Sequence, residues 1–205
     1  MNLIQSRKIR PSELRRVALL FFVLAATVTV AAISLHSSAA NTGNGDWDKR
    51  SPDIHWPARH APNDADLFAH NELLIKSPRW TVWRHIIEAP KWPEWYPNAH
   101  DVRIVKGRTD VLEANSRFEW NTFGLQIDST VHEFVPETRA GWFGKGKDID
   151  AYHTWLLAST PEGCKVVTEE VVIGPGAIAL RTADPDAMHK GHDLWLSSLK
   201  QLSEK

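Results

Sequence analysis

The sequence of 205 residues contains one cysteine and carries almost no net charge, and both shortages exclude classes of protein. With Cys164 alone, the chain has neither an intrachain disulfide nor a zinc site built on cysteine ligands. A net charge of −1, without a basic stripe, attracts no nucleic acid, so we expect no nucleic-acid partner. Cys164 follows a glycine in a predicted turn, which favours a passive thiol over a nucleophile.

Several catalytic and cofactor-binding motifs are missing as well. The sequence has no Gly-x-Ser-x-Gly nucleophile motif and no His-Glu-x-x-His zinc motif. Residues 144–148 include two glycines, but no helix is expected after them, so they predict a hairpin turn rather than a phosphate loop. His189 and His192 lie three residues apart on an expected helix without an evident third ligand. We therefore expect no metal and no other cofactor.

The N-terminal segment carries the clearest local signal. Residues 1–16 hold five basic side chains against one acid, and residues 17–35 contain no charge at all. About 20 apolar residues span a bilayer, and a basic flank stays in the cytoplasm. The length favours a transmembrane anchor over residues 17–36, whereas the small residues at 37–40 fit a cleaved signal peptide. Both interpretations place the rest of the chain outside the cytoplasm, in the periplasm if the host is Gram-negative.

Residues 37–66 are rich in Gly, Pro, Asn, Asp and Ser and show no hydrophobic period, which predicts a linker. Trp47 and Trp56 within it are candidates for docking onto the following domain. No matching acid or cysteine completes a metal site with His55 and His60, so we expect them to be solvated. One domain is then expected over residues 67–205.

The first part of that domain predicts strand, helix, short helix and strand. Ser77 is the expected N-cap and Pro78 the first residue of the helix, whose apolar face is formed by Trp83, Ile86 and Ile87, with Trp80 behind them. The other expected elements are a strand at 71–75, one helical turn between Pro93 and Pro97, and a strand at 101–107.

The second part changes to a period of two, which predicts antiparallel strands with one apolar face. Phe118 and Trp120 share a face of the segment 116–122, and Leu125, Ile127 and Val131 share a face of the next. Residues 161–163 predict a hairpin turn between two more strands. A closing helix is expected from Asp184 as cap and Pro185 to about Ser203, with one apolar stripe formed by Met188, His192, Trp195, Leu199 and Leu202.

In order and spacing, these segments resemble the SRPBCC superfamily, which includes START-type lipid-transfer domains and polyketide cyclase/dehydrase-like proteins. The resemblance covers nearly all of residues 67–205 and is carried by "IKSPRWTVWRHIIEAPKWPEWYP", "RFEW", "HTWLL", "VVTEEVVIG" and "HDLWLSSLKQLSE". It implies an α+β helix-grip fold, with a curved antiparallel sheet of about seven strands around the C-terminal helix. The N-terminal hydrophobic helix would lie outside this domain.

The resemblance further implies a deep hydrophobic cavity between the sheet and the closing helix. Ten tryptophans are unusual for a chain of this length and are available to line it. Trp92, Trp95 and Tyr96 would close one end, although a plain aromatic mini-core explains them equally well. The expected ligand-binding residues are Trp92, Trp95, Tyr96, Phe118, Trp120, Trp155, Met188, His192 and Trp195.

Candidates for chemistry are few. Glu169 and Glu170 are neighbours on a predicted strand and point to opposite faces, so one of them points inward. We favour Glu170, because it matches an acidic position of the family pattern. With His153 or His192 it would form an acid–base pair, so these three are the candidate catalytic residues. The alternative is a polar tether that satisfies a buried indole N–H or a ligand hydroxyl.

Two functions follow, because the fold hosts binders and enzymes alike. The first is binding or transfer of a hydrophobic small molecule or lipid by an exported, membrane-anchored domain. The second is a cyclase, dehydrase or hydrolase that uses the Glu/His pair. Export counts against a polyketide cyclase, whose substrates are made on cytoplasmic carriers. A third interpretation is a protein–protein module without a ligand.

Overall fold

The computed structural model of the protein describes residues 45–205. The basic segment 1–16, the apolar segment 17–36 and the first residues of the expected linker lie outside the described residues. Across residues 45–205, no helix is both long enough and apolar enough to cross a membrane.

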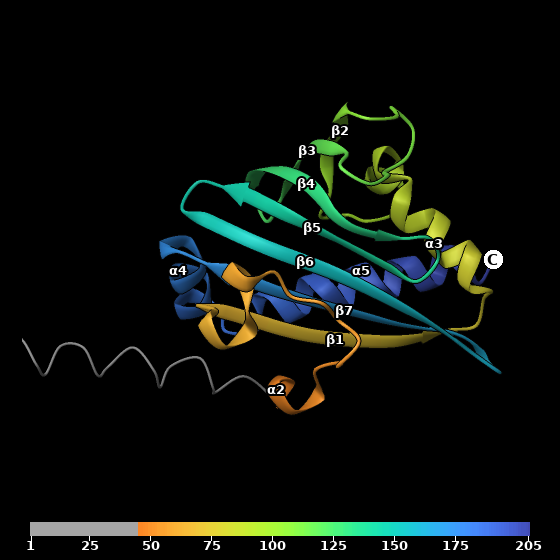
Figure 1. Ribbon diagram of the computed structural model, residues 1–205, viewed down its shortest axis with the longest axis horizontal. Helices are drawn as coiled ribbons and strands as arrows, with labels where there is room; N and C mark the ends of the chain where they lie inside the picture. The colour runs from red at the N-terminus through yellow and green to blue at the C-terminus, as the bar shows by residue number, and fades with distance from the viewer. Residues whose placement is uncertain (1–44) are drawn as a thin grey trace, which may run out of the picture. The chain divides into compact units, whose positions relative to one another are not determined.

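One antiparallel sheet of seven strands organises the described part of the chain (Figure 1). Its strand order is β1-β7-β6-β5-β4-β3-β2, so strands adjacent in sequence pair throughout, except that β1 joins the other end of the sheet beside β7. The predicted α+β sheet of about seven strands is confirmed. The bounds are β1 Leu67–Ile75, β2 His100–Lys106, β3 Arg117–Thr122, β4 Leu125–Val135, β5 Arg139–Gly146, β6 Ile149–Thr160 and β7 Gly163–Ile173.

The long helix α5 (Ala187–Ser203) packs against the inner face of this sheet. The predicted apolar stripe faces the sheet, since Met188, His192, Trp195 and Leu199 are all buried. On the sheet side, alternation places Phe118 and Trp120 of β3 inward, as predicted, together with Ile127 and Val131 of β4.

Several predicted boundaries are wrong. Helix α3 (Arg79–Ile87) begins after Pro78, which occupies the N-cap position, and no side chain, that of Ser77 included, caps its first turn. Trp80 is not on the buried face, since 54% of its surface is exposed. The short 3₁₀ helix η3 (Ala89–Glu94) precedes the expected turn.

A further helix, α4 (Pro175–Ala183), was not predicted, and it lies directly before α5. Pro175 stands at the first position of this helix, where proline is well tolerated. Because α4 and its connection occupy residues 175–186, α5 starts at Ala187 instead of Pro185.

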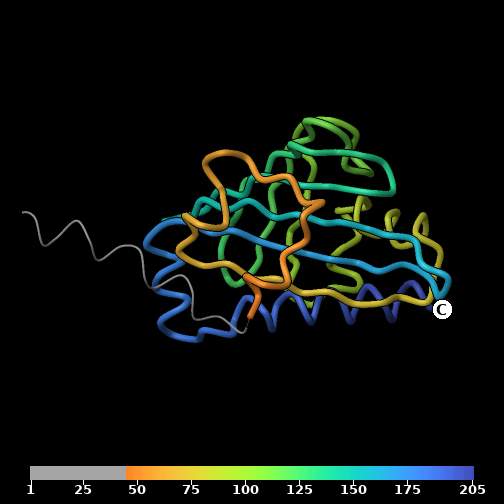
Figure 2. Tube along the Cα trace, turned by 60° about the horizontal axis from the view of Figure 1, so that its bottom comes forward, coloured from red at the N-terminus to blue at the C-terminus, as the bar shows by residue number. Residues whose placement is uncertain are grey.

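Residues 45–66 pack against the outer face of the sheet (Figure 2). Ile54 is buried against Leu156 and Val167, and the ring of Trp56 contacts Phe68 and Tyr152. The docking expected of Trp56 is therefore observed. The segment includes α2 (Asp46–Lys49), η1 (Ala58–His60) and η2 (Pro62–Asp64).

The expectation that His60 is solvated is wrong. Its exposed fraction is 4%, and its ring lies against Phe143 and Tyr152. Its Nε2 atom lies 3.0 Å from Oδ1 of Asp150 on β6, a partner that is distant in sequence. His55, by contrast, remains exposed beside Glu133.

Cys164 is fully buried at the start of β7. Burial raises the pKa of its thiol to about 11, against the smaller lowering effect of the Arg79 charge. The thiolate is the reactive form, so a thiol held in this state fits the passive role expected from the sequence.

A cluster of aromatic side chains fills most of the space between the sheet and α5. Trp92 of η3 is fully buried in it and contacts Phe118, Trp120, Trp142 and Trp195 at centroid distances of 5.2 to 5.8 Å. Its indole N–H donates to the carbonyl of Ile86 at 3.1 Å. Trp92 is therefore a core residue. This agrees with the interpretation of its segment as a plain aromatic mini-core.

We expect Trp92→Ala to lower the free energy of unfolding by about 3–5 kcal/mol, because it empties a large buried site. The matched change, Trp95→Ala, affects a half-buried ring at the edge of the same segment and should cost about 1 kcal/mol. Guanidinium unfolding followed by circular dichroism measures both. Equal losses in the two variants would contradict this assignment of Trp92 to the core.

Candidate functional site

A cavity of about 70 Å³ remains beside the aromatic cluster, between the inner face of the sheet, α5 and α4. Most of its wall is apolar, and polar groups from β6, β7 and α5 meet at one place. The lining residues are Tyr96, Trp120, Thr122, Phe123, Leu125, Ile127, Ser129, Trp142, Gly144, Ile149, Ala151, His153, Glu170, Val172, Ala177, Leu180, Met188, His192 and Trp195.

The cavity is much smaller than the deep one that the resemblance implied, because tryptophans occupy the rest of the space. Of the expected ligand-binding residues, Tyr96, Trp120, Met188, His192 and Trp195 line it. Trp92, Trp95, Phe118 and Trp155 do not. Trp155 is buried and stacks on the ring of His153 at 5.4 Å. That the lining residues bind a ligand stays a prediction.

Glu170 lines the cavity, and Glu169 points to the outer face. Glu169 is fully buried under the segment 45–66, where its Oε1 accepts bonds from the backbone N–H of Ser51 and from His70. Glu170 is Cα partner to His153 on β6 and lies opposite His192 on α5. The three candidate catalytic residues are thus brought together in one place.

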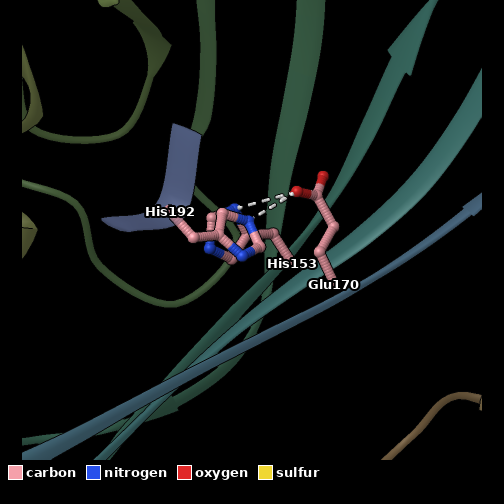
Figure 3. Close-up of side chains that lie close together, drawn as sticks. All are labelled: His153, Glu170 and His192. Carbon is pink, nitrogen blue, oxygen red and sulfur yellow. Dashed lines mark hydrogen bonds and ion pairs between the residues drawn. The ribbon is translucent and has the colours of Figure 1, made fainter. Parts of the chain in front are cut away.

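The distances within this group are short. Oε2 of Glu170 lies 3.1 Å from Nε2 of His192 and 3.8 Å from Nδ1 of His153 (Figure 3). Among the described residues, ligand atoms of these three side chains all lie within 4.8 Å of one another. Both histidines are almost fully buried.

Asn71 on β1 determines which nitrogen of His192 carries a proton. Its Nδ2 donates to Oδ1 of Asp193 at 2.7 Å, which turns Oδ1 of Asn71 toward Nδ1 of His192 at 3.1 Å. An amide oxygen accepts only, so Nδ1 of His192 is the donor. Nε2 is then the atom that faces Glu170.

Thr168 on β7 does the same for His153. The Thr168 hydroxyl donates its one proton to the carbonyl of Thr154 at 3.0 Å, so its oxygen accepts from Nε2 of His153 at 2.7 Å. The lone pair of Nδ1 therefore faces Glu170. Neither Asn71 nor Thr168 was singled out in the sequence, because their role depends on partners brought close by the sheet and α5.

Burial determines the charge state of His153. The charge state of Glu170 depends on the two neighbouring histidines as well as on burial. Burial lowers the pKa of His153 to about 3, so this ring is neutral at physiological pH. Burial alone would raise the pKa of Glu170, but the interactions with His153 and His192 lower it below its ordinary value.

Phe123 is a cavity residue that the sequence analysis missed. It lies in the turn between β3 and β4 with a φ of 51°, followed by Gly124 at 72°. A positive φ is unfavourable for phenylalanine, and such strain often accompanies a function. The backbone N–H of Phe123 donates to Asn98, and its ring occupies the space that a side chain at Gly191 would need. Phe123 thereby closes the cavity against α5.

Tyr96 supports the same edge. Its hydroxyl accepts from Nδ2 of Asn98 at 3.0 Å and donates to the carbonyl of Gly191 at 3.4 Å. Burial raises its pKa to about 12, against the lowering effect of the bond from Asn98. Tyr96 therefore stays a neutral hydroxyl, and Asn98 links it to the turn that carries Phe123.

No protein-family model and no curated protein sequence matches this chain. Solved structures do resemble it. The hypothetical protein jhp0584 from Helicobacter pylori is 28% identical with a TM-score of 0.69, covering 75% of this chain and 98% of its own. Protein CV1439 from Chromobacterium violaceum is 15% identical with a TM-score of 0.53, covering 67% of this chain and 97% of its own.

A third similar structure is the di-domain ARO/CYC protein StfQ from the steffimycin biosynthetic pathway. It is 17% identical with a TM-score of 0.57, and the match covers 68% of this chain and 52% of StfQ. At this identity the similarity shows the fold alone. Together these solved structures support the helix-grip arrangement, a seven-stranded antiparallel sheet with a C-terminal helix. Ligand binding is compatible with this fold.

Proposed function

We propose that this SRPBCC-like domain binds a small, largely apolar molecule in the cavity between the sheet and α5. The observation that carries the proposal is a mainly apolar cavity with a polar corner formed by His153, Glu170 and His192. Small-molecule sites commonly combine apolar walls with a few convergent polar groups. Lipid transfer, the other form of the binding hypothesis, fits less well because Trp92, Trp142 and Trp195 fill the space that an acyl chain would need.

The size of the cavity limits the ligand. At about 70 Å³ it is smaller than a cavity of about 150 Å³ that accepts benzene. An aromatic ring would fit after displacement of Phe123, whose turn is the most exposed part of the wall. The ligand expected on these grounds is a single-ring compound rather than a fused or long-chain one.

The polar corner predicts where a ligand's polar group would lie. An ionised carboxylate accepts hydrogen bonds, so a hydroxyl or amine on the ligand would bind to Glu170. Trp195 also lines the cavity, and its indole N–H has no partner among the described residues. A ligand oxygen or a water molecule would satisfy it.

We expect p-cresol to bind at least about tenfold more tightly than toluene, because only its hydroxyl can donate to Glu170. Met188→Trp places a large ring in the cavity and should abolish binding of both probes. Leu194→Trp, at an exposed position of the same helix, is the matched control and should leave binding unchanged. Ligand-observed NMR on the purified full-length chain measures these affinities.

Failure of both probes to bind would contradict the proposal, as would unchanged binding in Met188→Trp. Native mass spectrometry of the chain purified from its host adds an independent test, since a co-purified small molecule identifies the ligand directly. A bound long-chain lipid would favour the transfer hypothesis instead.

Catalysis is the second candidate function, and it rests on the charge states around the cavity. An ionised Glu170 beside a neutral His153 is suited to accept a proton from a bound substrate. StfQ is described as a di-domain ARO/CYC protein of the steffimycin biosynthetic pathway, so proton transfer on an aromatic or polyketide-like substrate is the reaction class to test.

Glu170→Gln separates the two functions, because it removes the charge and keeps the shape. An enzyme should lose about 10²–10⁴-fold in turnover while substrate binding persists. A binding protein should lose only part of its affinity, since glutamine still accepts a hydrogen bond. Full turnover in Glu170→Gln would exclude Glu170 as the base.

We further propose that the domain lies outside the cytoplasm. The proposal rests on the basic residues 1–16 followed by the uncharged stretch 17–35. A reporter that is active only outside the cytoplasm, fused after Lys205, should be active in living cells. The same fusion with a cytoplasm-only reporter is the control, and activity of that reporter would contradict the proposed topology.

A further inference from the structure

The corner formed by His153, Glu170 and His192 contains an electrostatic conflict. The lone pair of Nδ1 of His153 points toward Oε2 of Glu170, because Nε2 of His153 donates to Thr168. Nε2 of His192 points toward the same oxygen, because its Nδ1 donates to Asn71. In these tautomers, the lone pairs of the two ring nitrogens and of the carboxylate oxygen converge and repel. Something positive must lie among them, either a proton or a metal ion.

We propose that these three side chains bind a divalent first-row transition-metal ion. Two imidazoles and one glutamate are the ligand set of several catalytic zinc sites, and two histidines with one carboxylate also suit Fe²⁺. The proposal goes beyond small-molecule binding and does not depend on it.

The distances suit such an ion. Bonds of about 2.0–2.2 Å in tetrahedral geometry place neighbouring ligand atoms about 3.3 Å apart. The observed separations from Oε2 of Glu170 are 3.1 Å to His192 and 3.8 Å to His153, which bracket that value. The ligand nitrogens of His153 and His192 lie within 4.8 Å of each other, so side-chain rotations that bring them closer together would close the site around a metal.

The surroundings also suit a metal site. Metal-bound histidines usually donate their other ring N–H to a fixed acceptor, which orients the ring and raises its basicity. Asn71 serves His192 in this way, and Thr168 serves His153. All three proposed ligands line the cavity, so a water molecule or a small ligand can occupy a fourth coordination position.

The competing explanation is a proton shared between His192 and Glu170, which would make the pair an ordinary buried ion pair. This explanation accounts for the 3.1 Å contact but gives no role to the lone pair of His153, which lies 3.8 Å from the same oxygen. The ion pair also predicts no metal affinity above that of scattered surface histidines. The two explanations therefore differ in one measurable property.

The test is titration of the purified full-length chain with Zn²⁺ after removal of bound metal with a chelator. Calorimetry should show one tight site per chain. Glu170→Gln and His153→Gln should each weaken it at least about 100-fold. Thr168→Val, which removes the acceptor behind His153 together with the hydrogen bond to the carbonyl of Thr154, should weaken it by about 10- to 100-fold. His55→Gln and His100→Gln, at exposed histidines outside the cluster, are the controls and should leave the affinity unchanged.

Co²⁺ provides a second readout that needs no variant. Bound in a site of low coordination number, it should give intense visible d–d absorption, which Zn²⁺ displaces. A folded chain without a stoichiometric Zn²⁺ site would overturn the proposal, as would a site whose affinity is the same in Glu170→Gln as in the wild-type chain. Because the titration contains no organic probe, and p-cresol binding can be measured in chelator-treated protein, each of the two proposals can fail without the other.

Discussion

The packing of Trp195 determines where the functional groups of this domain lie. Its ring stacks on Tyr96 at a centroid distance of 4.5 Å and an interplanar angle of 6°. Edge contacts join it to Trp92 at 5.2 Å and Trp155 at 5.0 Å, so it is held from both the η3 side and the sheet side. These contacts oppose rotation of the helix against the sheet. His192, three residues earlier, lies on the same helix face and is thereby held over β6 and β7.

The same packing explains why the cavity is small. A helix-grip fold leaves a space between one helix and a concave sheet, and in this protein large aromatic rings occupy most of it. What remains lies toward α4, where Met188, Ala177 and Leu180 are the wall residues. The many tryptophans therefore contribute mainly to the core. The region left for ligand recognition is the small polar corner at the edge of this core.

Much of this arrangement could be predicted from the sequence because it depends on local periodicity. A period of two assigns Phe118 and Trp120 to the core side of β3, and the opposite orientations of Glu169 and Glu170 follow from the strand pleat alone. The location of His60 could not be predicted, since its partner Asp150 is 90 residues away. Helix α4 was missed because Pro175 and Gly176 are typical of turns as well as of helix starts. Asn71 carried no signal, since an isolated asparagine acquires its role only when Asp193 and His192 are brought beside it.

Asn71 also connects the cavity to the segment before the domain. Its Oδ1 accepts from Nδ1 of His189 at 3.2 Å as well as from His192, which uses both lone pairs of that oxygen. Nε2 of His189 in turn lies 2.8 Å from Oδ2 of Asp46 in α2. A chain of polar contacts thus runs from Asp46 to His192, at the polar corner of the cavity. Residues of the expected linker therefore help to hold the histidine that faces Glu170, and the structural unit around the site begins well before Leu67.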